Sequence, residues 1–112
     1  MERLKFEFPA MGVKGRRVHV GVVASGDLEV LLEPREDTVS VVTITTRIEG
    51  HEATWRSVLE RFFARHDKSV RIHINDFGAT PGMVGLRLEQ AMELCINDND
   101  SHDNGPKTFE PR

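Results

Sequence analysis

The chain has 112 residues and a formal net charge of −3 at pH 7, with 29% charged and 6% aromatic residues. This length favours a single domain that folds without disulfides. The single cysteine, Cys95, cannot form an internal disulfide, and this suits a cytoplasmic protein. The basic residues are too scattered for a nucleic-acid-binding surface and no apolar run reaches the length of a membrane span, so neither nucleic acid nor membrane is expected as a partner.

Alternating and β-branched apolar residues in the first half of the chain predict four strands. They are residues 2–8, 17–24, 27–33 and 38–48. In the first strand, Leu4, Phe6 and Phe8 alternate with polar residues, which is typical of a strand with one buried face. The fourth is rich in valine, isoleucine and threonine, which favour a pleated surface, so we expect it near the centre of the sheet.

A short turn joins the second and third predicted strands. Ser25, Gly26 and Asp27 form it, and both Ser-Gly and Gly-Asp are strong turn signals because glycine takes positive φ without steric cost. Two strand-like runs with so short a connection predict a β-hairpin, with Ser25 at its tip and its hydroxyl facing solvent. A lone exposed serine is a weak nucleophile, but it is a suitable point for covalent attachment.

The second half of the chain changes to the periodicity of helices. Residues 51–66 are predicted to form a helix, because four large apolar residues follow the i, i+3, i+4, i+7 spacing of a core-facing stripe. These residues are Trp55, Val58, Leu59 and Phe62. A fifth strand is predicted at residues 69–75, where valine and isoleucine alternate with polar residues.

A second helix is predicted to begin after Thr80. Threonine is a favoured N-cap and Pro81 suits the first helical position. The predicted buried stripe of this helix is Val84, Leu88, Ala91 and Cys95. Arg87 and Glu89 are expected on its solvent face. Between the fifth strand and this helix, residues 76–79 are expected to form a turn in which Phe77 is buried and Gly78 has an unusual φ.

The order of four strands, a helix, a strand and a helix predicts an α+β fold. We expect two layers, with a mixed, mostly antiparallel sheet of about five strands and two helices on one face, joined mostly by sequential hairpin-like connections. Residues 97–112 are polar and acidic with nothing to bury, so we interpret them as a disordered tail that follows a domain of residues 1–96.

Three short stretches carry a resemblance to a known family. They are residues 22–32 (VVASGDLEVLL), 76–82 (DFGATPG) and 86–90 (LRLEQ). In this order, and together with the opening Leu-Lys-Phe-Glu-Phe-Pro, they resemble the acyl carrier (delta) subunit of bacterial malonate decarboxylase. The resemblance covers residues 1–95, which is nearly the whole predicted domain.

The resemblance implies a modified serine. In that family a serine in the matching turn carries a 2′-(5″-phosphoribosyl)-3′-dephospho-coenzyme A arm through a phosphodiester. Ser25 is therefore the implied point of covalent attachment, and Gly26 and Asp27 are the implied arm-binding residues beside it. Ala24 stands where the family has glycine.

The same resemblance implies a non-catalytic carrier that holds acetyl and malonyl groups as thioesters. The implied partners are a subunit that transfers acetyl and malonyl groups, a pair of decarboxylase subunits, a transferase that attaches the arm, and the enzymes that load it. A thioester carbonyl delocalises the charge that decarboxylation leaves, and a tether raises the effective concentration of substrate at each partner.

Other interpretations of the whole chain stay open. The chain could carry the same arm for another acid, as in citrate lyase, or it could be an unmodified docking or scaffold subunit. A small serine hydrolase is disfavoured, because a nucleophile elbow needs glycine two residues before and after the serine, where Val23 and Asp27 stand.

Individual residues also have purely structural explanations. Asp27 is as well explained by its preference for turns, and residues 76–78 are explained by a strand-to-helix turn rather than a docking surface. Arg16 and Arg17 are explained by solubility at the flank of a strand rather than by binding phosphates of the arm. Five histidines lack ligand-like spacing, so we expect no metal site. They are His19, His51, His66, His73 and His102.

Overall fold

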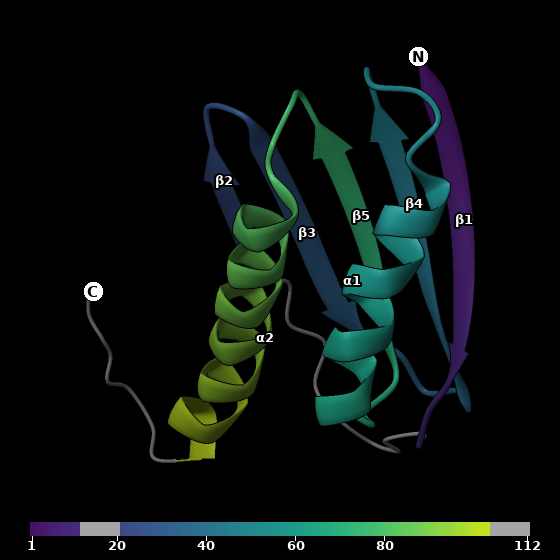
Figure 1. Cartoon of the computed structure of the whole chain (residues 1–112). Helices are drawn as coiled ribbons and strands as arrows, with labels where there is room; N and C mark the ends of the chain where they lie inside the picture. Colours follow the sequence, from purple (N-terminus) through teal and green to yellow (C-terminus); the bar gives the residue numbers. More distant parts are fainter. Residues whose placement is uncertain (12–20, 104–112) are drawn as a thin grey trace.

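A computed structural model describes the backbone of residues 1–11 and 21–103 (Figure 1). The described elements are β1 (Glu2–Pro9), β2 (Gly21–Ser25), β3 (Leu28–Pro34), β4 (Val39–Thr46), α1 (Glu52–Arg65), β5 (Val70–Asp76) and α2 (Pro81–Asp103). They form two layers, a five-stranded sheet and a layer in which both helices cover the same face (Figure 1). The predicted α+β fold is confirmed.

The sheet has the strand order β1-β4-β5-β3-β2. The β1–β4, β3–β5 and β2–β3 pairs are antiparallel and the β4–β5 pair is parallel, so the sheet is mixed and mostly antiparallel, as predicted. The expected hairpin-like connections are wrong for most of the described sheet, because among the described strands only β2 and β3 are joined as a hairpin. A parallel pair needs a crossover, and α1 supplies it between β4 and β5. The predicted place of β4 near the centre is confirmed.

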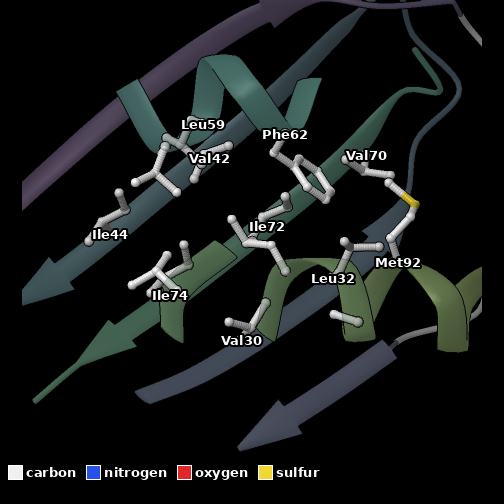
Figure 2. Close-up of a cluster of buried hydrophobic side chains, with 14 of the residues drawn as sticks. Val30, Leu32, Val42, Ile44, Leu59, Phe62, Val70, Ile72, Ile74 and Met92 are labelled. Atoms are coloured by element: carbon white, nitrogen blue, oxygen red, sulfur yellow. The ribbon is translucent and has the colours of Figure 1, made fainter. Parts of the chain in front are cut away.

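The hydrophobic core lies between the sheet and the two helices (Figure 2). Along β3, β4 and β5, every second side chain points toward the helices and is buried. The predicted stripes of both helices are confirmed, since each of their eight residues is at most 6% exposed. Met92, which was not predicted, joins the buried stripe of α2 and belongs to the same core cluster as Val70 and Leu32 (Figure 2).

Helix α2 packs closely on the edge strand β2. A Cβ atom on Gly21 would lie 2.5 Å from the carbonyl oxygen of Ala91, which is closer than non-bonded atoms approach. The absence of a side chain at Gly21 therefore lets the backbone of α2 rest directly on β2. This contact fixes α2 above the strand that ends at Ser25.

The start of α2 is as predicted and its end is not. Thr80 Oγ1 accepts a hydrogen bond from the Met83 amide at 3.2 Å, which confirms the N-cap. The helix continues to Asp103, beyond the predicted boundary at residue 96, so residues 97–103 are helical rather than part of a disordered tail. Residues 104–112 lie outside the described residues, and the domain boundary stays a prediction. None of the described helices combines the length and apolar character that crossing a membrane requires.

Glu89 joins the two helices instead of lying on a solvent face. Its carboxylate accepts a hydrogen bond from Arg65 Nε at 3.1 Å and a second from the Arg65 guanidinium, and its other oxygen lies 2.8 Å from His66 Nε2. Partial burial raises the pKa of Glu89. The hydrogen bonds and charges of Arg65 and His66 lower it by a larger amount, so the pKa of Glu89 is below its usual value. Arg87 also departs from the expected solvent face, because its Nε atom is buried.

Candidate functional site

The β2–β3 hairpin has a two-residue turn. Ser25 pairs with Leu28, so Gly26 and Asp27 alone make the turn and Ser25 is the last residue of β2, beside the tip rather than at it. Gly26 does not use positive φ, contrary to the prediction, and an added Cβ there would meet no atom within 4 Å. The chain at the turn is therefore open on the side of Gly26.

The Ser25 hydroxyl is held by a carboxylate rather than directed freely into solvent. Its Oγ donates a hydrogen bond to Asp27 Oδ1 at 2.7 Å, and it lies 3.4 Å from the carbonyl oxygen of Leu28. Ser25 and Asp27 are both half-buried. The expectation of a lone serine at the tip is thus corrected: a carboxylate in this position orients Oγ and is placed to take up its proton.

Ser25 belongs to a row of residues that crosses four strands. The register pairs Ser25 with Leu28, Leu28 with Asp76, and Asp76 with Thr46. Partners in such a row share a face of the sheet, and Leu28, Asp76 and Thr46 are buried on the helix-covered face. The Ser25 side chain therefore emerges on the same face. The strand β2, which Ser25 closes, ends at the end of the sheet where both helices begin (Figure 1).

Asp76, which was predicted to lie in a turn, is buried and hydrogen-bonds both to β4 and to the turn that follows β5. It is the last residue of β5 and only 4% exposed. Thr46 Oγ1 donates to Asp76 Oδ2 at 2.8 Å, and Oδ1 accepts from the amides of Gly78 (3.2 Å) and Ala79 (2.9 Å). The alternation of Val70, Ile72 and Ile74, continued by one step, gives the signal that would have placed Asp76 inward.

The turn after β5 is tied to the serine hairpin. The Phe77 amide donates to the Asp27 carbonyl oxygen at 2.9 Å. Gly78 has φ +126°, which confirms the expected unusual φ. The prediction that Phe77 is buried is wrong, since its side chain is 49% exposed and the Arg47 guanidinium lies 5.3 Å from its ring centroid. The Phe77 backbone thus contacts the serine turn, while its exposed ring lies against Arg47, which follows β4.

A cavity of about 280 Å³ opens beside this turn, between the first turns of α1 and α2. Thr46 and Asp76 form its polar floor, and its walls include Trp55, Val58 and Val84. Nothing in the sequence pattern predicted this cavity, because it depends on how far apart the two helix starts lie.

Of the remaining candidates, Arg16, Arg17 and His19 lie outside the described residues. Cys95 is buried in the core, as expected of a small hydrophobe. Within residues 1–11 and 21–96, no group of three or more histidine, cysteine, aspartate or glutamate side chains is arranged to hold a metal ion.

Comparison with known proteins gives consistent matches. A family model described as the malonate decarboxylase delta subunit (MdcD) matches residues 15–95. The malonate decarboxylase acyl carrier protein of Azotobacter vinelandii is 49% identical over 98 residues, which are 87% of this chain and 99% of the relative. The protein of the same name from Pseudomonas fluorescens (strain SBW25) is 48% identical over 99 residues, or 88% of this chain and 100% of the relative.

A solved structure matches as well. One chain in the crystal structure of a Pseudomonas malonate decarboxylase hetero-tetramer in complex with malonate is 44% identical, with a TM-score of 0.73 over 85% of this chain and 99% of that chain. The region matched by the family model, residues 15–95, includes the serine hairpin, the β5–α2 turn and most of α2. By sequence and by structure, the chain belongs to the malonate decarboxylase delta subunit family.

Proposed function

We propose that this chain is a non-catalytic acyl carrier subunit of a malonate decarboxylase and that Ser25 Oγ is the atom that carries its prosthetic group. The observation that carries the proposal is the 2.7 Å hydrogen bond from Ser25 Oγ to Asp27 in an open two-residue turn. The relatives' name, malonate decarboxylase acyl carrier protein, supports the carrier role.

The residues around Ser25 fit a large covalent substituent. Gly26 has open space where a side chain would stand, and Ala24 is exposed. The proposed group is phosphoribosyl-dephospho-coenzyme A, joined to Oγ by a phosphodiester, and when attached it supplies a thiol on which an acyl group is held as a thioester. Ser25, Gly26 and Asp27 are the residues proposed to hold its attached end.

Asp27 has a defined role in this proposal. Its Oδ1 atom orients the Ser25 hydroxyl and takes up the hydroxyl proton when Oγ becomes an ester oxygen. The Phe77 amide fixes the backbone of Asp27 and so keeps this carboxylate in place. A separate transferase supplies the phosphoryl donor: Oγ forms the new bond to phosphorus while the bond to pyrophosphate breaks, and pyrophosphate leaves.

The proposed partners are the subunits that exchange and decarboxylate the acyl group and the enzyme that attaches the arm. The relative of known structure lies in a malonate decarboxylase hetero-tetramer, which supports assembly with other subunits. Exposed Phe77, with Arg47 against its ring, lies near the serine turn and is a candidate contact for them. The proposed location of this complex is the cytoplasm.

The intact mass of the chain, co-expressed with its native modifying enzymes, tests this proposal. We expect a mass increment equal to phosphoribosyl-dephospho-coenzyme A on the peptide that contains Ser25, and no increment in Ser25→Ala. The matched control, Ser57→Ala, removes an exposed hydroxyl on α1 and should be fully modified. An unmodified wild-type chain beside active modifying enzymes would overturn the carrier function and favour an unmodified docking subunit.

A further inference from the structure

The cavity between α1 and α2 has the composition of a small binding site for an uncharged group. Its walls are largely apolar, and Trp55 in its wall is only 6% exposed. Its volume, about 280 Å³, falls just below the range of about 300–1,000 Å³ that is usual for pockets that hold whole ligands. It therefore suits the last few atoms of a longer molecule better than a complete cofactor.

The cavity and the Ser25 hydroxyl lie on the same face and at the same end of the sheet. The floor residues Asp76 and Thr46 stand in the same cross-strand row as Ser25, with Leu28 between. Two strand spacings separate β2 from β5, which corresponds to about 10 Å. A flexible chain of pantetheine length attached to Ser25 is longer than this separation.

The turn between β5 and α2 links the two places, because the Phe77 amide bonds to Asp27 and Ala79 lines the cavity. Gly78 has no side chain, and Ala79 has a single methyl group. An added Cβ on Gly78 would meet no atom within 4 Å, so the space above this position is open. The bulky Phe77 side chain is turned outward, toward Arg47. Gly78 and Ala79 therefore place no large side chain between the serine turn and the cavity.

The carboxylate of Asp76 on the cavity floor determines which chemical groups at the end of such a chain the cavity can accept. Asp76 and His51 are the ionisable side chains in the lining, and His51 is exposed at the mouth. The two carboxylate oxygens of Asp76 already accept hydrogen bonds from Thr46, Gly78 and Ala79. A second carboxylate placed close to Asp76 in this apolar cavity would be repelled, whereas an uncharged end would not.

From these observations we infer that the cavity is a resting site for the far end of the group carried on Ser25, and that it accepts this end when it is uncharged and rejects it when it ends in a carboxylate. The inference rests on the proposed function. The carrier would thereby shelter an uncharged end from solvent and leave a carboxylate-bearing end exposed to a partner enzyme.

Reactivity of the arm thiol tests the inference without any decarboxylase activity. The modified protein is first verified by intact mass and then treated with an aromatic disulfide reagent, with the unmodified chain as the blank for Cys95. If the resting site holds the end in about 90% of molecules, the thiol should react about tenfold more slowly than in a variant whose cavity is blocked. Thr54→Phe is that variant, because Thr54 is exposed and lines the cavity. Ser57→Phe is the control, since Ser57 is exposed on the same helix and does not line it.

The charge selection is tested by capping the arm thiol with iodoacetamide or iodoacetate, which leaves ends that differ only in a carboxamide or a carboxylate. Trp55 is the single tryptophan and lines the cavity, so its fluorescence reports occupancy. The carboxamide cap should shift the emission relative to the unmodified chain, and the carboxylate cap should not. Thr54→Phe should abolish the shift and Ser57→Phe should keep it.

Three failures are distinguishable. Absence of the mass increment would overturn the proposed function and this inference with it. The resting site alone would be overturned if the arm is attached, its thiol reacts equally fast in wild type and Thr54→Phe, and neither cap changes the Trp55 emission. Equal emission shifts with both caps would overturn the charge selection.

Discussion

The backbone amide of Phe77 donates a hydrogen bond of 2.9 Å to the carbonyl oxygen of Asp27, so the turn after β5 braces the turn beside Ser25. The two motifs are fifty residues apart in the chain, and this contact joins them into one site. Since Asp27 also holds the Ser25 hydroxyl, a displacement of the β5–α2 turn would be transmitted to the proposed attachment point.

Ser25→Ala should leave the fold intact. The substitution removes one hydrogen bond from a half-buried side chain, which costs about 1 kcal/mol at most in unfolding free energy. Urea unfolding of the purified variant measures this cost. A loss of several kcal/mol would mean that Ser25 is a structural residue and would weaken any conclusion drawn from its lost modification.

Asp27→Asn should slow attachment of the arm. The amide preserves the shape of the side chain but cannot take up the Ser25 proton, and general-base assistance contributes at least about 10²-fold. The rate of the mass increment, followed with purified transferase, gives the measurement. Glu29→Gln, which neutralises an exposed carboxylate on β3, is the control and should be modified at the wild-type rate. Equal rates for Asp27→Asn and wild type would contradict the proton-accepting role.

Trp55→Ala should destabilise the protein strongly. Trp55 is 6% exposed and packs in the core between α1 and the sheet, so its truncation should cost about 3–5 kcal/mol. Chemical denaturation gives the change in midpoint. A midpoint close to that of the wild type would show that the wall of the cavity contributes little to the core.

Gly21→Ala and Gly26→Ala form a matched pair. At Gly21 the new methyl group would meet the Ala91 carbonyl oxygen at 2.5 Å, so α2 must shift and the expected cost is about 1–3 kcal/mol. At Gly26 the methyl group meets no atom within 4 Å and φ is not positive, so stability should change by no more than about 0.5 kcal/mol. Similar thermal midpoints for the two variants would contradict the close packing of α2 on β2.

Glu89→Gln should alter the acid side of the stability profile. The pKa of Glu89 is lowered in the folded protein, so its ionised form stabilises the fold above the unfolded pKa, and this contribution is lost as pH falls through the lower folded value. The wild type should therefore exceed Glu89→Gln in unfolding free energy at pH 6, with a difference that shrinks below about pH 4.5. A constant difference between pH 6 and pH 3 would exclude this ionisation as the cause.

Local periodicity was sufficient to predict the helices and strands, and it was not sufficient to predict the topology. The stripe of Trp55, Val58 and Phe62 repeats within one helix, so it can be read without knowing the neighbours. The pairing of β1 with β4 joins Glu2 to Thr46, and no local signal records a contact of that separation. The expectation of sequential hairpins failed for this reason.

The site was predicted in part for a similar reason. The Ser-Gly-Asp turn is a local signal and was found, and the resemblance singled out Ser25. The burial of Asp76 and the exposure of Phe77 depend on where β5 ends, and the predicted strand stopped one residue early. That single residue decides which of the two side chains faces the core, because neighbouring side chains in a strand point to opposite faces.

The brace between Asp27 and Phe77 also has a consequence for biosynthesis. The chain emerges from the ribosome N-terminus first, so the β2–β3 hairpin can form well before β5 and the residue that braces it have been made. Pairing of β3 with β5 then closes a long loop and is slow compared with the formation of a hairpin. A nascent or truncated chain that ends before Phe77 therefore presents the Ser25 hydroxyl without this contact, and completion of the proposed attachment site coincides with completion of the sheet.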